Sequence, residues 1–202
     1  MTAKAYIVDD DEAIRDALGW LLESCGVACE KWPSAEAFLE QFEACAGNLP
    51  GCLLLDIRMD GMSGLQLFQI LQERGSRLPV IFLTGHGDVP MAVGALKKGA
   101  FDFVEKPFND NELAERVVQA IELDRQQRTA LEGAATVRTL LAQLTERERQ
   151  VMDLILAGKM NKIIADELAI SMRTVEVHRA RLFEKMGVKS AVELAQLMKS
   201  GG

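Results

Sequence analysis

The chain has 202 residues, of which 49% are hydrophobic and 26% are charged, and its formal net charge is −7 at pH 7. This length exceeds one average domain, and the hydrophobic share is ample for two small cores. The sequence starts without a charged-then-apolar leader and has no uninterrupted apolar run long enough to span a bilayer, so we expect a soluble, cytoplasmic protein with no membrane partner.

The charge is divided unevenly along the chain. Residues 1–124 contain 10 basic and 21 acidic side chains, whereas residues 125–202 contain 13 basic and 9 acidic ones. An acidic first part and a basic second part indicate different partners, and the basic part is the candidate for binding nucleic acid.

Short apolar runs alternate with segments of helical period over residues 1–124. The expected strands are 5–8, 28–32, 52–55, 80–83 and 103–105, and the expected helices begin near Glu12, Ser34, Ser63, Val89 and Asn109. Runs of this length, bounded by turn residues, are typical of buried parallel strands. We therefore expect an α/β domain with a doubly wound, five-stranded parallel sheet.

Polar side chains stand where four of these runs stop: Asp9, Asp10, Asp56, Thr84 and Lys106. Each alone has an ordinary explanation, such as a turn, a helix cap or a surface lysine before a proline. The carboxyl ends of parallel strands gather at one edge of a sheet, where ligands bind in this kind of fold. The joint placement therefore predicts one polar site.

The residue types at this site point to phosphoryl transfer. Three carboxylates at one point need a cation, and an all-oxygen set favours a hard ion such as Mg²⁺. Asp56 can then attack phosphorus and carry an acyl phosphate, while Lys106 offsets the charge on the transferred oxygens. Thr84 supplies a hydroxyl that can bond a phosphoryl oxygen.

The segment that follows changes character. Residues 125–140 are polar and alanine-rich without an apolar stripe, and Gly133 weakens a helix there, so we expect a partly helical linker. Residues 141–202 then carry helix start and stop signals, which predict a small all-α bundle of four short helices. The signals are capping boxes at Thr145/Glu148 and Ser190/Glu193, N-caps at Asn161 and Ser171, and stops at Gly158 and Gly187.

Within this bundle, residues 161–186 have helix-turn-helix spacing, because two helices are joined by the tight connection 169–171. The second helix sets basic side chains against an apolar side that includes Val175, Leu182 and Met186. This pattern is typical of a recognition helix that enters the major groove of DNA. The alternatives are an ordinary solvated helix face and a bundle that contacts another protein.

Several segments carry a resemblance to a known family. The first part resembles the receiver domain of two-component response regulators in Ile7-Val8-Asp9-Asp10-Asp11, Leu55-Asp56-Ile57-Arg58-Met59, Thr84-Gly85-His86-Gly87 and Glu105-Lys106-Pro107-Phe108. The last part resembles the LuxR-type DNA-binding domain in Leu144-Thr145-Glu146-Arg147-Glu148 and Thr174-Val175-Glu176-Val177-His178. The run from Thr84 to Val93 is similar to the FixJ-like subfamily, so the resemblance spans nearly the whole chain.

For the first part, the resemblance implies a flavodoxin-like receiver with Asp56 as phosphoacceptor. It makes Asp10 a direct Mg²⁺ ligand, Asp9 a ligand through water, and the carbonyl of Arg58 a further ligand. It also makes Thr84 and Phe103 a switch pair. The peptide before Pro107 is expected to be cis, which proline tolerates.

For the second part, the resemblance implies which residues contact bases and which contact phosphates. Glu176, Val177 and Ala180 are expected to face base edges. The residues expected to hold phosphates are Thr174, His178, Arg181, Lys185 and Lys162. Arg179 suits either role.

Together these features predict a transcription regulator that binds double-stranded DNA and is not an enzyme. The resemblance implies that a sensor histidine kinase phosphorylates Asp56, that the protein then dimerises, and that the dimer binds a promoter, with RNA polymerase as a further expected partner. An aspartyl-phosphate phosphatase is the enzymatic alternative, but it needs a second acid where this chain has Arg58.

Two acidic residues lie outside the pattern. The family usually has proline after Met59, and this chain has Asp60, which either alters the pocket or is a solvated turn residue before Gly61. Asp11 follows the acidic pair, and we expect it to cap the next helix instead of binding metal.

Overall fold

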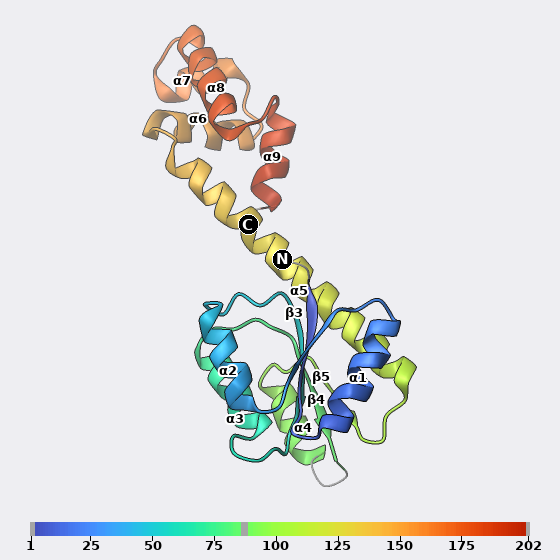
Figure 1. Ribbon diagram of the computed structural model, residues 1–202. Coiled ribbons are helices and arrows are strands. Elements are labelled where there is room, and N and C mark those ends of the chain that lie inside the picture. The colour runs from blue at the N-terminus through green and yellow to red at the C-terminus, as the bar shows by residue number, and fades with distance from the viewer. Residues whose placement is uncertain (1–2, 86–88, 201–202) are drawn as a thin grey trace. The chain divides into compact units, whose positions relative to one another are not determined.

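The computed structural model of the chain describes residues 3–85 and 89–200. The chain divides into two compact units, residues 1–127 and 128–202 (Figure 1).

The first unit is built on a five-stranded parallel sheet in the order β2-β1-β3-β4-β5. The strands are β1 Lys4–Val8, β2 Cys29–Trp32, β3 Gly51–Asp56, β4 Val80–Thr84 and β5 Asp102–Glu105. The helices between and after them are α1 Glu12–Ser24, α2 Ala35–Ala44, α3 Gly64–Glu73, α4 Val89–Lys97 and α5 Asp110–Ala142. The predicted doubly wound sheet is confirmed.

Apolar side chains cover both faces of this sheet. On one face, Phe38 of α2 and Leu67 of α3 pack against alternate side chains of β3 and β4, including Phe82. On the other face, Leu18 of α1 and Val117 of α5 pack against the opposite side chains of the same strands. Figure 1 shows α2, α3 and α4 on one side of the sheet and α1 and α5 on the other. Burial on both faces explains why the central strands β3 and β4 are nearly continuous apolar runs, whereas the edge strands β2 and β5 also carry charged residues.

Local capping fixes where three of these helices begin. Asp11 accepts hydrogen bonds from the backbone N–H groups of Ala13 and Ile14, so its predicted role as the cap of α1 is confirmed. Ser34 caps α2, and Ser63 forms the full capping box of α3, as the sequence indicates.

Glycine is required at the first residue of α3. A side chain at Gly64 would place its Cβ 2.1 Å from the carbonyl oxygen of Asp56. The start of α3 therefore packs directly against the end of β3.

Helix α5 differs from the expectation for residues 125–140. It runs without a break from Asp110 to Ala142, and the boundary between the two units falls within it. Gly133 destabilises a helix by about 1 kcal/mol, which is smaller than the summed helix propensity of the surrounding alanine, leucine, glutamate and arginine residues.

The second unit contains α6 Glu146–Leu156, α7 Asn161–Leu168, α8 Met172–Met186 and α9 Ala191–Ser200. Val151, Ile164, Val175, Leu182 and Leu194 form its core. The four predicted helices are therefore confirmed. No helix in the described parts of the chain is both long enough and apolar enough to cross a membrane.

Most of the predicted caps in this unit are present, with two differences. Thr145 and Glu148 form a capping box, Ser171 caps α8, and Gly187 ends α8 in the left-handed conformation. Asn161 is not a cap, because it is already the first helical residue of α7.

The second difference is at the start of α9. Ser190 accepts the N–H of Glu193, but the carboxylate of Glu193 accepts from the N–H of Lys189 instead of Ser190. Only half of the predicted capping box is formed.

Candidate functional site

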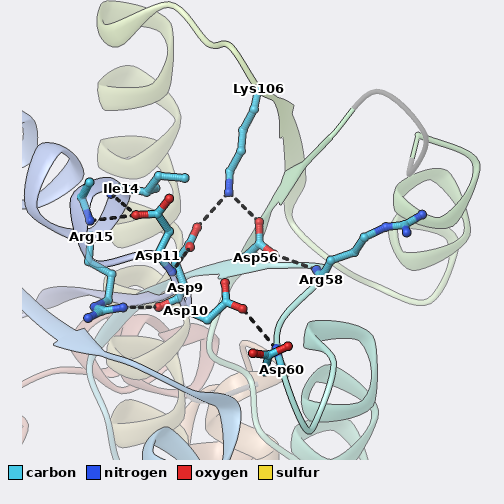
Figure 2. A network of polar contacts seen from close by, with 10 residues as sticks. Asp9, Asp10, Asp11, Ile14, Arg15, Asp56, Arg58, Asp60 and Lys106 are labelled. Atoms are coloured by element: carbon cyan, nitrogen blue, oxygen red, sulfur yellow. Dashed lines mark hydrogen bonds and ion pairs between the residues drawn. The ribbon is translucent and has the colours of Figure 1, made fainter.

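A buried ion pair network lies at the carboxyl edge of the sheet in the first unit. The Lys106 ammonium, just after β5, lies 2.8 Å from Asp9 Oδ2 and 2.6 Å from Asp56 Oδ1. Asp9 is 1% exposed and Asp56 is 7% exposed, so both carboxylates are largely removed from water. Figure 2 shows the lysine reaching between the two acids. The structure thus brings together three of the side chains predicted for this site.

Burial and pairing act against each other on these charges. Burial is the largest influence on Asp56 and raises the pKa of its carboxyl group, while the hydrogen bond from Lys106 lowers it in part. Burial also opposes the charged form of Lys106, but the hydrogen bonds to Asp56 and Asp9 together outweigh it and raise the pKa of the ammonium. One fixed positive charge therefore serves two buried carboxyl groups.

The remaining oxygens of these acids are held by the backbone. Asp9 Oδ1 accepts the N–H of Asp11 at 2.9 Å, and Asp56 Oδ2 accepts the N–H of Arg58 at 2.7 Å. Asp10 is exposed and its Oδ2 accepts the N–H of Asp60 at 3.1 Å (Figure 2). Asp10 is therefore at the site but engaged with the chain that follows β3.

The donor set is chemically suited to Mg²⁺. The predicted ligands Asp9, Asp10, Asp56 and the carbonyl of Arg58 offer only oxygen atoms, and Mg²⁺ takes one or two carboxylates and keeps several waters. Within residues 3–85 and 89–200, no three His, Cys, Asp or Glu side chains are gathered closely enough to hold a metal ion. The metal ligands remain predictions, and one oxygen of Asp10, Oδ2, already accepts the N–H of Asp60.

The predicted switch residues lie on β4 and β5, next to the pocket. Thr84 is fully buried at the end of β4, and its Oγ1 has no hydrogen-bond partner among the described residues. A buried unpaired hydroxyl is costly, so it is ready to accept a new polar partner. Phe103 is paired with Phe82 across the strands and is partly buried against the core of that face. The Lys106–Pro107 peptide is cis, as expected.

The residues 86–88, which continue the motif after Thr84, lie outside the described part of the chain.

The second unit presents the predicted helix-turn-helix. Helices α7 and α8 are joined through Ala169, which is in the left-handed conformation, and through Ser171, which caps α8. Val175, Leu182 and Met186 of α8 are buried, so the helix has the apolar side that the sequence predicts.

The predicted base-reading residues lie on the exposed face of α8. Glu176, Val177 and Ala180 are exposed, as is Arg181. Among the predicted phosphate contacts, Lys162 at the start of α7 is exposed, whereas Thr174 and His178 are partly buried.

Two of these side chains have partners in α8 or at its N-cap. Thr174 is 2.8 Å from the Ser171 hydroxyl, which positions it at the helix start. Arg179 is partly buried and stacks over the ring of Phe183 at 5.3 Å.

Lys185 has a contact that the sequence did not suggest. Its ammonium lies 2.7 Å from Glu148 Oε2 and 3.2 Å from the carbonyl of Gln143. Glu148 is 2% exposed and also accepts the N–H of Thr145 at 2.8 Å. The phosphate contact of Lys185 stays a prediction, and the structure gives this side chain a role in joining α8 to the start of α6.

Two further carboxylates were missed by sequence reasoning. Glu36, at the start of α2, accepts the N–H of Met62 at 2.7 Å. Asp124, within α5, is 2% exposed and accepts the N–H of Gly51 at 2.8 Å. No local pattern reveals either contact, because the partners are 26 and 73 residues apart in the chain.

Comparison with known proteins matches both units to families. Residues 5–118 match the response regulator receiver domain, and residues 142–198 match the luxR family of bacterial regulatory proteins. The chain is 47% identical to the C4-dicarboxylate transport transcriptional regulatory protein DctR of Rhodobacter capsulatus, over 98% of this chain and 100% of that protein. It is 42% identical to the transcriptional regulatory protein FixJ of Bradyrhizobium diazoefficiens, over 100% of this chain and 98% of that protein.

Solved structures agree with this assignment. The response regulator StyR matches with a TM-score of 0.86 and 39% identity, over 98% of this chain and 99% of that one. Full-length FixJ from B. japonicum matches with a TM-score of 0.62 and 40% identity, over 100% of this chain and 98% of that one.

Proposed function

Because the chain belongs to the two-component response regulators that combine a receiver domain with a LuxR-type DNA-binding domain, we propose that Asp56 is its phosphoacceptor and that phosphorylation raises its affinity for promoter DNA. We assign residues 1–124 to the receiver, 125–140 to the linker and 141–202 to the DNA-binding domain. The phosphodonor is a sensor histidine kinase, and the protein acts in the cytoplasm, where its DNA partner lies.

The observation that carries this proposal is the largely buried ion-pair cluster of Asp9, Asp56 and Lys106. Asp56 Oδ1 accepts a hydrogen bond from the Lys106 ammonium at 2.6 Å. Thr84, whose hydroxyl has no hydrogen-bond partner among the described residues, ends the neighbouring strand β4. The Asp56 carboxylate is largely buried and is held by Lys106 and by the N–H of Arg58, which orients it for attack on phosphorus. The fixed lysine charge is already in place for the oxygens that arrive.

Transfer forms a bond between a carboxylate oxygen of Asp56 and phosphorus, and breaks the bond between phosphorus and the donor histidine nitrogen. Lys106 then exchanges its bond to Asp56 for one to a phosphoryl oxygen. Receiver domains in general bind Mg²⁺ at this site; we propose that Asp10, Asp56 and the Arg58 carbonyl hold it, with Asp9 acting through water. When bound, Mg²⁺ offsets the negative charge of the phosphoryl group.

The response reaches the rest of the receiver through Thr84. Its hydroxyl gains a partner in the phosphoryl group, moves toward it, and leaves space that the ring of Phe103 takes up. The face formed by α4 and β5 then pairs with a second copy. Two recognition helices in one dimer bind two half-sites, so weak half-site binding becomes specific binding.

On DNA, we propose that Glu176, Val177 and Ala180 read base edges, because they share the exposed face of α8. The proposed phosphate contacts are Thr174, His178, Arg181, Lys185 and Lys162, with Arg179 in either role. RNA polymerase is the proposed partner of the bound dimer.

The test is sedimentation of the full chain with Mg²⁺, with and without acetyl phosphate as donor. We expect a shift from monomer to dimer, accompanied by mass addition of one phosphoryl group, in the wild type and in the control Asp16→Asn, whose carboxylate is exposed and pairs with Lys31. The Asp56→Asn variant should show neither change. A donor-dependent dimer in Asp56→Asn would contradict the mechanism.

A further inference from the structure

The loop between β3 and α3, residues 57–63, is held by carboxylates at alternate positions. The backbone N–H groups of Arg58, Asp60 and Met62 each donate to one carboxylate oxygen. The acceptors are Asp56 at 2.7 Å, Asp10 at 3.1 Å and Glu36 at 2.7 Å. They come from the end of β3, the segment after β1 and the start of α2, so three separate elements fix one loop.

Glu36, which accepts the N–H of Met62, is ionised. The backbone N–H groups of Glu36 itself and of Met62 lower the pKa of the Glu36 carboxyl, so it is an ionised acceptor at neutral pH. The loop also closes on itself through the bond from Gly64 N–H to the Ile57 carbonyl at 3.1 Å. The Met62 end of the loop is therefore held by contacts that do not involve Asp10.

The middle bond lies at the phosphorylation pocket. Asp10 Oδ2 accepts the N–H of Asp60, and Figure 2 shows the Asp10 carboxylate turned toward that backbone atom. The N–H group carries a partial positive charge, so it repels a cation that takes the same Asp10 oxygen, and the two compete for that oxygen. The side chain of Asp60 is exposed, and this bond uses only its main chain.

We propose that the backbone N–H of Asp60 holds the carboxylate of Asp10 in a resting position and thereby weakens Mg²⁺ binding, so that metal binding releases the β3–α3 loop from Asp10. Asp60 is a positioning residue in this scheme. The inference rests on the proposed function, because it takes Asp10 to be a metal ligand.

The backbone N–H of Asp60 is expected to weaken Mg²⁺ binding, whereas its carboxylate is expected to strengthen it. Two substitutions separate these effects. Its carboxylate attracts a cation from nearby, so Asp60→Ala should bind Mg²⁺ as well as the wild type or somewhat less well. Asp60→Pro removes the same carboxylate and also the N–H, because proline has no backbone donor. The comparison of Asp60→Pro with Asp60→Ala therefore isolates the hydrogen bond.

The expected effect follows from the strength of one hydrogen bond. A typical intramolecular hydrogen bond makes only a small net contribution to free energy, and this one is exposed. Its loss should therefore tighten Mg²⁺ binding about three- to tenfold. Isothermal titration of the full chain with Mg²⁺, without any phosphodonor, measures this directly. Equal dissociation constants for Asp60→Pro and Asp60→Ala would overturn the inference.

A second measurement does not depend on the folding of a proline variant. In the wild type, the amide ¹⁵N and ¹H resonances of Asp60 should move on addition of Mg²⁺, and Asp10→Ala should move them in the same direction without metal. The Met62 amide should stay in place, because Glu36 still holds it. If the Asp60 amide resonances move neither with Mg²⁺ nor in Asp10→Ala, the inference is refuted. If the wild type does not bind Mg²⁺ at all, the proposed metal site itself is refuted.

Discussion

The contact between Lys185 and Glu148 leads to a prediction that separates two roles for a basic side chain on α8. The Lys185 ammonium lies 2.7 Å from a carboxylate that is 2% exposed. Replacing Lys185 with methionine keeps most of its apolar stem and removes the charge. We expect the variant to lose stability in the second unit, because Glu148 remains buried without its cation.

The size of the loss follows from the exposure of the two partners. Breaking a fully buried ion pair costs about 3–5 kcal/mol. Here the Lys185 side chain is 33% exposed and the Thr145 N–H continues to donate to Glu148, so part of that cost is avoided. We expect a loss of about 1–3 kcal/mol in the free energy of unfolding.

The matched control is Arg181→Met, at an exposed position on the same helix. Loss of a phosphate contact lowers the dependence of log affinity on log salt concentration by about 1, without affecting stability. We expect that pattern for Arg181→Met. For Lys185→Met, which removes a proposed phosphate contact and also the partner of Glu148, we expect both a lower salt slope and a loss of stability.

Both properties are measurable on the full chain. The two tryptophans, Trp20 and Trp32, lie in the first unit, so urea unfolding should be followed by circular dichroism, with hydrogen exchange to assign the change to residues 143–187. Anisotropy of a labelled, non-specific DNA duplex at several salt concentrations gives the slope. If Lys185→Met lowers the slope as much as Arg181→Met but leaves stability unchanged, the ion pair with Glu148 does not stabilise the second unit and the prediction is wrong.

Three further outcomes follow from contacts in the two units. Asp124→Ala leaves the N–H of Gly51 buried without an acceptor and should cost about 1–3 kcal/mol, with faster amide exchange at the start of β3; unchanged exchange there would contradict it. Ala169→Gly relieves a left-handed non-glycine residue (φ 53°) and should stabilise the second unit by about 0.5–1 kcal/mol in urea unfolding, and a loss would show that the turn is unstrained. The pKa of Glu148 is lowered in the folded state, because hydrogen bonds from Lys185 and Thr145 outweigh the effect of burial; its stabilising effect is therefore complete above its ordinary pKa and is lost as the pH falls through the lowered value. The urea midpoint of the second unit should fall between about pH 7 and about pH 3 by more in the wild type than in Glu148→Gln.

The sequence was sufficient for features that depend on local pattern or on strand direction. Asp9, Asp56 and Lys106 meet because parallel strands end at one edge of a sheet, and that geometry is independent of detailed packing. The caps at Asp11 and Ser63 are equally local, since the donor and acceptor lie within three residues.

Contacts between distant segments could not be predicted. The pairs Asp124 with Gly51 and Lys185 with Glu148 depend on how helices pack, which a single sequence does not specify. Asp60 shows the same limit, because its exposed side chain fits the predicted solvated turn residue while its main chain bonds to Asp10. The sequence did not predict an unbroken α5, because the helix-weakening effect of Gly133 was taken to exceed the summed helix propensity of its neighbours.

Strand β3 is held by a polar contact at each of its ends. Its first residue, Gly51, donates to the buried Asp124 of α5, and a side chain there would bring its Cβ within 1.8 Å of the Lys4 carbonyl. Its last residue is Asp56, which pairs with Lys106. The six residues of β3 span roughly 17–20 Å, so one stiff segment runs from the pocket to the opposite rim of the sheet. The proposed phosphoacceptor and the N–H group that binds Asp124 of α5 therefore belong to the same strand.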